Sequence, residues 1–526
     1  MSGSFSPVAG ARPAMAAAAL CATIVFILWN GICGASAQDA ASPVFELVKK
    51  RAEALAAQDY AEPEAVEQDS LPGSYDSYRK IAFDRERSLW RGSDSGFEVQ
   101  FMPLGWLFKH EVRIWLIEDG EIKPAHVTAA DFIDRRGEDD SHFQSPDTPV
   151  PVSGLRINWP LNQPDKPDEV IVFQGASYFR ALARGQQYGL SARGLAIGTA
   201  SPEGEEFPEF REFWIEKPGD HSLGIDIYAL LDSPSASGAY HFHVQPGDVT
   251  FVDVDSVIYP RREIANVGIA PLTSMFMLGP IDRTRKDDFR PEVHDSDGLA
   301  ILNGSKERLW RPLSNPRTLQ VSAFVDNGNN GFGLIQRERR FERYEDLEAR
   351  YDLRPSTWVE PLSDFGPGSV MLVEIPTERE IHDNIVAFWR PEQPLMPGTP
   401  ARFHYRLHWR ADSPTREMGP FARTTRAGLT QAETEDEPKH LFVIDYTGQE
   451  NLAETLKTGE LPEAEVTAST GRIENVVVAQ NRQSGGLRLT FEFFPDGAKV
   501  AELRASLMDL SGEPMEKWLY RWTPEQ

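Results

Sequence analysis

Cysteine is almost absent from this sequence. Of the 526 residues only two are cysteines, Cys21 and Cys33, both close to the amino terminus. Beyond residue 33 the chain therefore has no disulfide framework, no thiolate metal site and no cysteine nucleophile. Its stability has to come from burial, which a chain of this length can supply because the buried fraction of the surface rises with size. We expect two domains, at least one of them large.

Positive charge is also scarce. Lysine and arginine number 54 against 80 aspartates and glutamates, so the net charge is −26, and −27 if Arg12, the only charged residue among the first 37, is lost with a leader (−26 − 1). Such a surface repels phosphate groups, which excludes nucleic acid and anionic lipid as ordinary partners. A neutral polysaccharide meets no such repulsion. Plain solubility is the alternative explanation of the acidity.

The amino-terminal segment predicts export. Arg12 precedes an apolar run over 14–28, and Ala35 and Ala37 supply the small residues of a cleavage site before Gln38. This pattern predicts a Sec-type signal peptide over residues 1–37. Twin arginines and a lipoprotein box around Cys33 are both missing. An uncleaved anchor is the alternative, because the apolar run approaches the length of a membrane span.

Long helical patterns are rare as well. One helix is predicted over 42–55, where Ser42 provides an N-cap, Pro43 occupies the first turn and apolar residues recur on one face. A second, shorter helix is predicted over 344–351. The rest alternates with a period of two between glycines and prolines, and Asp119-Gly120 is a strong hairpin signal. These patterns predict a mainly β protein.

The composition divides the chain. Short alternating strands up to residue 410 predict a large β-sandwich over 38–410. Residues 411–438 are polar and acidic, which is typical of a connector. Strand patterns resume over 439–526, a length that suits an immunoglobulin-like sandwich.

Two acidic segments carry the functional signal. Segment 290–298 contains Asp295, and segment 382–389 places Asp383 just before an aromatic strand. Glycosidic cleavage needs one protonated acid and one carboxylate that activates water, while aromatic faces stack on sugar rings. Ordinary turn aspartates are the alternative. A calcium loop through Asp295 and Asp297 is a weaker one, since the later ligands of such a loop are missing.

Metal and phosphate sites have little support. His241 and His243 would share one face of a strand, but no third ligand accompanies them. The glycine-rich segment 328–333 lacks the Lys-Ser/Thr of a phosphate loop. We interpret it as a mobile loop and a candidate lid, and we expect no metal and no cofactor.

Several ungapped segments resemble one family. They are 173–180 (Phe-Gln-Gly-Ala-Ser-Tyr-Phe-Arg), 188–196, 231–234, 238–240 and 270–276, together with both acidic segments. In this order they resemble the periplasmic glucan biosynthesis proteins G and D over essentially the whole mature chain. The Asp297-Gly298 pair and the Sec-type leader resemble protein G more closely, because D proteins commonly carry a twin-arginine leader.

The resemblance implies a galactose mutarotase-like β-sandwich followed by an immunoglobulin-like domain, working in the periplasm on the β-1,2-glucan backbone of osmoregulated periplasmic glucans. Some members are anomer-inverting endo-β-1,2-glucanases and some relatives transfer the chain. Carried over, the general acid falls on Asp383 and the general base on Asp295, the base acting through waters and a substrate hydroxyl. The alternative is a noncatalytic glucan-binding factor that assists the inner-membrane glucan synthase, the implied partner.

Aromatic and polar residues near the acidic pair are candidates for contacts with glucose. The candidates are Tyr178, Trp310, Tyr351, Trp358, Trp389, His294 and Arg354. Asp383 must also hold its proton near neutral pH, which requires desolvation or a negative neighbour. Ile385, Phe388 and Trp389 are expected to provide apolar surroundings.

Overall fold

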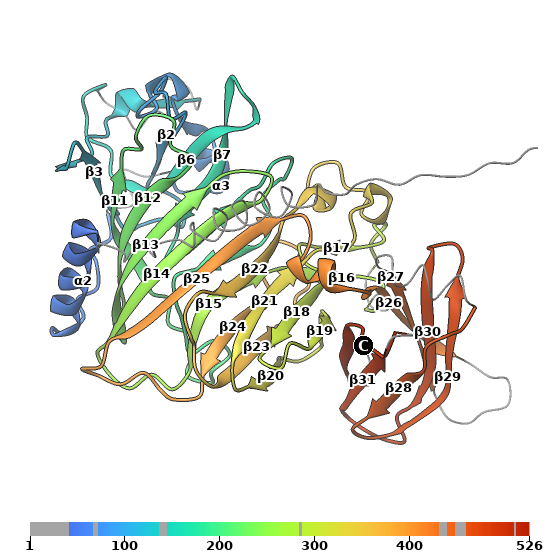
Figure 1. Cartoon of the computed structure of the whole chain (residues 1–526). Coiled ribbons are helices and arrows are strands. Elements are labelled where there is room, and N and C mark those ends of the chain that lie inside the picture. Colours follow the sequence, from blue (N-terminus) through green and yellow to red (C-terminus); the bar gives the residue numbers. More distant parts are fainter. Residues whose placement is uncertain are drawn as a thin grey trace, which may run out of the picture.

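The computed structural model describes residues 42–66, 72–135, 145–282, 287–430, 439–447, 459–509 and 512–524. The predicted signal peptide lies outside these residues. In the described ranges, no helix is both long and apolar enough to cross a membrane. Almost all regular structure is β, which confirms the predicted fold class (Figure 1).

Two large sheets carry most of the described strands. One has ten strands, in the order β2 (Glu98–Pro103), β6 (Val152–Gln163), β7 (Lys166–Gln174), β8 (Tyr178–Ala181), β9 (Ser191–Arg193), β15 (Val267–Ser274), β24 (Ile385–Pro391), β23 (Gly368–Glu374) and β20 (Gln320–Asp326), with β10 (Ala196–Ile197) also paired to β15. The other has fourteen, in the order β28 (Ala464–Ala468), β31 (Ala501–Leu507), β32 (Lys517–Trp522), β19 (Arg308–Pro312), β18 (Gly298–Asn303), β21 (Asn329–Ile335), β22 (Ser356–Pro361), β25 (Ala401–Arg410), β14 (Thr250–Pro260), β13 (Ala236–Gln245), β12 (Ile225–Asp232), β11 (Glu209–Glu216), β3 (Arg113–Glu118) and β4 (Glu121–Pro124).

Smaller elements complete the described structure. Three small sheets are β1 (Ile81–Phe83) with β5 (Phe132–Asp134), β16 (Phe276–Leu278) with β17 (Val293–His294), and β26 (Phe421–Thr430), β27 (Lys439–Thr447), β30 (Gly486–Phe494) and β29 (Arg472–Asn481) in that order. The helices are α2 (Pro43–Ala56), α3 (Tyr75–Tyr78) and the 3-10 turns Arg85–Arg87, Ala129–Asp131, Phe341–Arg343, Tyr351–Leu353 and Pro414–Met418.

The main core fills the space between the two large sheets. Phe173 and Phe179 from the ten-stranded sheet meet Phe210 and Phe242 from the fourteen-stranded sheet, with ring centroids 5.1–6.4 Å apart. Every second residue of these strands points inward, so the sandwich is held by interdigitated rings and aliphatic side chains. The predicted large β-sandwich is therefore present.

Helix α2 covers the outer face of the fourteen-stranded sheet at strands β12 to β14 (Figure 1). Phe45, Val48 and Ala52 are its buried residues. Burying Phe45 and Val48 stabilises this attachment by about 1.5–3 kcal/mol each. The helix predicted over 42–55 is confirmed.

The shorter predicted helix, over 344–351, is wrong. Glu345 and Arg350 have φ angles of 53° and 43°, in the left-handed region that a right-handed helix excludes. The chain makes two separate 3-10 turns instead, Phe341–Arg343 and Tyr351–Leu353. The hairpin at Asp119-Gly120 is confirmed, since positive φ angles of 53° and 80° there join β3 to β4.

Two other expectations from loop-like composition are also corrected. The predicted connector 411–438 contains strand β26, which pairs with β27 along its whole length. Its polar residues mark a half-exposed strand, so the domain limits at 410 and 439 stay a prediction. The predicted lid 328–333 lies largely in β21, a strand inside the large sheet. Glycine is required there because a Cβ at Gly331 would come within 2.3 Å of the Trp358 ring.

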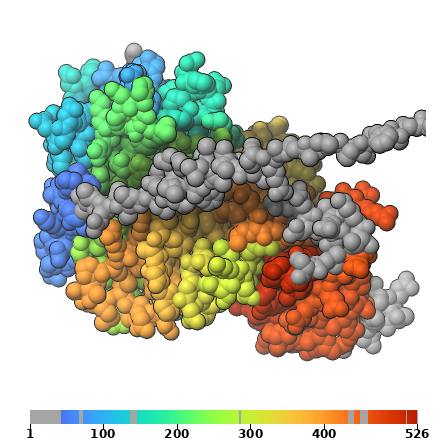
Figure 2. Space-filling model, viewed as in Figure 1, coloured from blue at the N-terminus to red at the C-terminus, as the bar shows by residue number. Residues whose placement is uncertain are grey.

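The carboxyl-terminal unit is continuous with the large sheet. Strand β32 pairs in parallel with β19, matching Leu309 with Lys517 and Trp310 with Trp518. The four-stranded sheet packs over this end and encloses a second core that contains Trp310 and Trp358 as well as Trp518. Figure 2 shows the red carboxyl-terminal unit against the yellow-green strands. Its immunoglobulin-like classification stays a prediction.

A buried ion pair ties the two parts together. Arg337, which follows β21, donates to both carboxylate oxygens of Glu516 at 2.7 and 2.8 Å, and the two side chains are 5% and 1% exposed. Arg337 also donates to the Ala422 carbonyl, and its guanidinium lies 3.4 Å from the centre of the Trp310 ring. The planar guanidinium of Arg337 thus contacts Glu516, the Ala422 carbonyl and the Trp310 ring at the same time.

We predict that Arg337→Met lowers the free energy of unfolding by about 3 kcal/mol or more, because it leaves the Glu516 carboxylate buried without its cation. Urea unfolding followed by tryptophan fluorescence measures this. Arg79→Met is the matched control: Arg79 pairs with Asp76 at 3.3 Å, but the two side chains are 63% and 79% exposed, so the loss stays within about 0.5 kcal/mol. Equal losses in both variants would contradict the prediction.

Candidate functional site

Asp295 and Asp383 are both anchored to one short stretch of backbone, Ser274–Phe276. Asp295 donates its backbone N–H to the Met275 carbonyl at 2.8 Å. On the other side, Asn384 follows Asp383 and clamps Phe276: its Oδ1 accepts the Phe276 N–H at 2.8 Å and its Nδ2 donates to the Phe276 carbonyl at 3.0 Å. The carboxylates, 88 residues apart in sequence (383 − 295), are thereby held at one place.

Strand pairing reinforces this arrangement. Ser274, the last residue of β15, pairs with Ile385 of β24, and Phe276 pairs with His294 of β17. Each aspartate therefore stands within two residues of a paired strand position. Asn384 is 1% exposed and its Nδ2 also donates to the Ile375 carbonyl at 3.0 Å. Both polar atoms of its side-chain amide are therefore hydrogen-bonded.

Asp295 is the buried member of the pair. Its residue is 3% exposed, and Arg354 donates to its carboxylate. Burial raises the pKa of Asp295 above its usual value, the cation of Arg354 opposes that rise, and the negative charge of Asp383 adds to it. Burial outweighs the neighbouring arginine, so the carboxyl takes up a proton more readily than an ordinary aspartate does.

Asp383 is the solvent-exposed member. Its side chain is 33% exposed, and Arg180 of β8 places Nη2 3.6 Å from Oδ2. Arg180 is itself oriented by Ser191, which accepts from its Nε at 2.7 Å. The expected apolar surroundings are not formed by the predicted residues, because Ile385, Phe388 and Trp389 are buried in the cores at 0–2% exposure. Ile385 and Trp389 point into the main core and Phe388 into a small cluster on the other face of the sheet, while Asp383 precedes the strand.

Two tyrosines flank the pair. Tyr351 is 2% exposed, donates its hydroxyl to Glu380 at 3.0 Å and lies under Arg354, whose guanidinium carbon is 4.2 Å from the ring centre. Tyr178 stands at the start of β8, accepts from Arg193 at 3.2 Å and has its pKa raised by burial. Tyr178, Tyr351 and Arg354 are thus near the aspartates, as predicted.

The three predicted tryptophans have no exposed ring face. Trp310, Trp358 and Trp389 are 3%, 3% and 0% exposed, and their rings are packed in the cores. Trp310 and Trp358 belong to the core beneath the carboxyl-terminal unit. Alternation along β19 and β22 directs both rings away from solvent, so they offer no face to a sugar in this structure.

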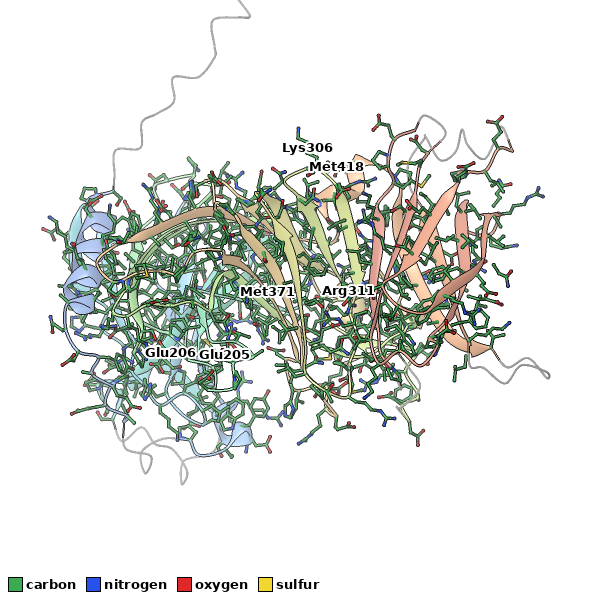
Figure 3. All side chains as sticks on the ribbon, turned by 90° about the horizontal axis from the view of Figure 1, so that it is seen from below. Glu205, Glu206, Lys306, Arg311, Met371 and Met418 are labelled. Atoms are coloured by element: carbon green, nitrogen blue, oxygen red, sulfur yellow. The ribbon has the colours of Figure 1, made fainter. Side chains whose placement is uncertain are left out.

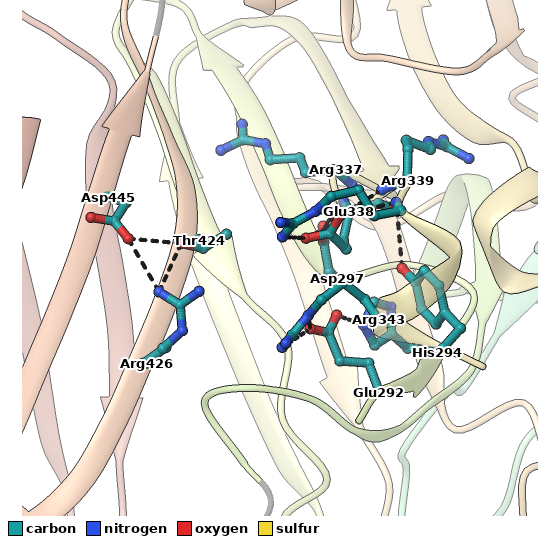
Figure 4. Close-up of polar contacts among 12 residues, drawn as sticks. Glu292, His294, Asp297, Arg337, Glu338, Arg339, Arg343, Thr424, Arg426 and Asp445 are labelled. Carbon is teal, nitrogen blue, oxygen red and sulfur yellow. Dashed lines mark hydrogen bonds and ion pairs between the residues drawn. The ribbon is translucent and has the colours of Figure 1, made fainter. Parts of the chain in front are cut away.

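His294 precedes Asp295 in the chain and lies in the buried interior. It is fully buried, its ring nitrogens contact Glu292 at 3.1 Å and Gln336 at 2.8 Å, and Arg343 pairs with the same Glu292 (Figure 4). Burial is the largest single influence and opposes a charge on this ring, but Glu292, Asp297 and Gln336 together outweigh it and raise the pKa of His294. We interpret His294 as a structural residue next to Asp295 and not as a contact for substrate.

Asp297 also has a structural role. Its Oδ2 accepts the backbone N–H groups of Arg337 and Glu338 at 3.0 and 3.2 Å (Figure 4), and burial raises its pKa to about 6. His241 and His243 both contact Asp226 Oδ1, at 2.8 and 2.9 Å. Across the ranges that the structure describes, no group of three or more histidine, cysteine or acidic side chains is arranged to hold a metal ion.

Two carboxyl groups therefore lie in this region, Asp295 buried and Asp383 exposed to solvent, each with an arginine beside it. The sequence matches a family model over residues 44–522, and that family is described as "Periplasmic glucan biosynthesis protein, MdoG". The chain belongs to this family.

Relatives agree with this assignment. "Glucans biosynthesis protein G" of Vibrio cholerae O1 is 48% identical over 479 residues, covering 89% of this chain and 85% of that protein. Proteins of the same name from Shewanella frigidimarina and Shewanella baltica are 48% and 47% identical, covering 86% and 88% of this chain and 79% and 85% of theirs.

A solved galactose mutarotase related enzyme from Lactobacillus acidophilus shares 9% identity with a TM-score of 0.21, over 46% of this chain and 97% of that one.

Arg180, Ser191, Arg193 and Glu205 complete this family member's site, although sequence reasoning assigned them no role. Arg193 is 2% exposed and donates to Glu205 at 2.7 Å. The neighbouring Glu206, labelled next to Glu205 in Figure 3, accepts from the Ser235 hydroxyl instead. The signal for three of the four was their place in segments 173–180 and 188–196, where arginine and serine interrupt apolar strands.

We predict that Asn384→Ala lowers the free energy of unfolding by about 2 kcal/mol or more, because three backbone groups, two of them buried, lose a hydrogen-bond partner. Chemical denaturation measures the loss. Asn330→Ala is the control, since exposed Asn330 makes one such bond, to the Asn303 carbonyl at 2.7 Å. If both variants lost the same small amount, Asn384 would not be the clamp inferred above.

Proposed function

We propose that this family member acts in periplasmic glucan biosynthesis on the β-1,2-glucan backbone, as an anomer-inverting endo-β-1,2-glucanase or a transglycosylase. The observation that carries the proposal is the joint anchoring of Asp295 and Asp383 on Ser274–Phe276. Cleavage of a sugar acetal requires two carboxyl groups at one place in different protonation states. We further propose that the signal peptide is removed before Gln38 and that the protein works in the periplasm.

We assign the two roles as the resemblance to the family implies. Asp383, which is open to solvent, can reach the glycosidic oxygen as general acid, and Arg180 beside it balances the charge left after proton donation. Asp295 is the general base. Its burial supports action through intervening water and a substrate hydroxyl, because a residue 3% exposed meets little bulk solvent.

The substrate class agrees with the surface charge. A net charge of −26 imposes no electrostatic cost on a neutral glucan. The inner-membrane glucan synthase is the proposed partner. The second candidate function, a noncatalytic glucan-binding factor beside that synthase, is kept because the carboxylates at the site are paired with Arg180 and Arg354, which an anchoring role would also need.

We predict that Asp383→Asn lowers turnover of linear β-1,2-glucan by at least about 100-fold while glucan binding survives, because the amide keeps the shape but cannot donate the proton. Asp295→Asn should act likewise from the base side. Chromatography of products and calorimetric binding measure both effects. NMR early in the wild-type reaction should show inverted product if the protein hydrolyses.

The outcomes separate the candidates. A wild-type protein that binds linear β-1,2-glucans but converts none of them would leave the binding factor as the function. An active wild type with an equally active Asp383→Asn variant would remove the acid role from Asp383, and Asp297 or Glu292 would be examined next.

The pH profile tests the base. Asp295 must be ionised to act, so activity falls as the pH drops through its raised pKa. Arg354 favours the ionised form, and Arg354→Met should therefore move the acid limb of kcat/KM to higher pH, whereas Arg354→Lys, which keeps the charge, should move it less. A shift of the alkaline limb instead would make Asp295 the acid and reverse the two roles.

A further inference from the structure

An exposed aromatic turn lies on the ten-stranded half of the molecule, just after β2. Gly105 and Phe108 exchange two backbone hydrogen bonds of 2.9 Å, and the turn they close carries Trp106 and Leu107 at its end. These two side chains are 36% and 66% exposed. Trp106 has a φ of 54°, a conformation that costs a bulky residue energy, and its N–H is held by the Pro72 carbonyl at 2.6 Å.

Other rings extend this turn into a surface. Tyr75 of α3 is 54% exposed, and its ring centre lies 5.1 Å from that of Trp106. Phe108 packs edge-on against Trp106 at 6.2 Å. We call Tyr75, Trp106, Leu107 and Phe108 the aromatic tip. Large rings kept at the surface in a strained turn point to a ligand that stacks on them.

A small polar pocket adjoins the aromatic tip. It measures about 70 Å³ and is walled by Phe108 on one side and by Glu209, His110 and Arg211 on the other. Glu209 receives His110 Nδ1 at 3.0 Å on each of its oxygens and Arg211 Nη1 at 2.8 Å. The side chains of Glu209 and His110 remain 27% and 29% exposed. A ring wall beside fixed donors and a carboxylate acceptor is a combination that suits sugar hydroxyls.

The tip and the pocket are continuous with the candidate site. Gly175 lines the pocket, lies within 3.0 Å of Phe108 when a Cβ is placed on it, and precedes Tyr178 by three residues. Phe207, two residues before Glu209, is 50% exposed and shares Arg193 with Tyr178, at 5.8 and 5.2 Å. A polymer bound at Asp383 therefore has aromatic and polar contacts available along this edge.

Other occupants fit less well. Anionic membrane is disfavoured by the net charge of −26. A neutral lipid surface would use the apolar rings but not the paired Glu209, His110 and Arg211 beside them. The joint presence of both kinds of group favours a neutral carbohydrate.

We propose that the aromatic tip and its pocket form a distal binding site for a glucosyl unit of a long glucan whose other end occupies the Asp295 and Asp383 site. This inference rests on the proposed function. It makes the protein select for chain length, because a short oligosaccharide bound at the carboxylates does not reach the tip.

The test compares two probes, a long linear β-1,2-glucan and its tetrasaccharide, by calorimetry. Trp106→Ala should bind the long glucan about tenfold more weakly and the tetrasaccharide unchanged, since a stacking contact is lost only where the chain reaches it. Glu209→Gln, which keeps the fold of the tip, should also weaken binding of the long glucan. Leu223→Ala is the control, because Leu223 is 76% exposed on the turn between β11 and β12.

Each outcome bears on either the distal site or the proposed function. Unchanged affinity of both variants for the long glucan, or equal weakening for both probes, would overturn the distal site and leave the proposed function standing. A wild type that binds neither probe would overturn the proposed function itself. Binding of wild type, but not of Trp106→Ala, to phosphatidylcholine vesicles, with glucan affinity unchanged, would assign the tip to a membrane and overturn the glucan site.

Discussion

The buried Arg337–Glu516 ion pair fixes how the carboxyl-terminal unit is joined to the large sandwich, beside the β19–β32 pairing. One guanidinium reaches Glu516, the Ala422 carbonyl and the Trp310 ring, and all of them are shielded from water. A charge that stays buried without its partner is costly, so the packed interface requires both Glu516 and Arg337. The same residue donates its backbone N–H to Asp297, two positions after Asp295. The carboxyl-terminal unit is thus linked through one arginine to the turn that carries a candidate catalytic group.

The site uses a different kind of support. Asp295 is held by its backbone hydrogen bond to Met275, and Asp383 by the side-chain amide of its neighbour Asn384, which binds the Phe276 backbone. Their contrasting exposure comes from position in the fold: one follows a buried hairpin strand, the other precedes an inner strand. Arginines then balance each carboxylate, Arg354 on the buried side and Arg180 on the exposed side. Rigid sheets fix the spacing while short loops set the solvation, so two chemically identical side chains lie in different environments, and burial raises the pKa of Asp295.

Local patterns predicted the elements whose causes are local. The Asp119-Gly120 hairpin depends on two adjacent positive φ angles, and helix α2 depends on a proline in its first turn and one apolar face, so both were readable from the residues. The helix over 344–351 failed because periodicity does not reveal left-handed residues such as Arg350. Strands β21 and β26 were missed because glycine and charge indicate loops on average, whereas here Gly331 makes room for Trp358 and the polar residues of β26 are partly buried in a strand that pairs with β27.

For the candidate site, the sequence by itself determined the chemistry on offer: two carboxylates in distinctive segments, a mainly β chain, no cysteine beyond residue 33 and an acidic surface suited to a neutral polymer. Only the tertiary structure decided which groups meet. It buried Trp310, Trp358 and Trp389, brought Arg180 and Arg354 to the aspartates, and left Trp106 at the surface beside a polar pocket. The reason is physical: a residue's type sets its charge and shape, but its solvation and its neighbours depend on strands that are distant in sequence and adjacent in the sheets.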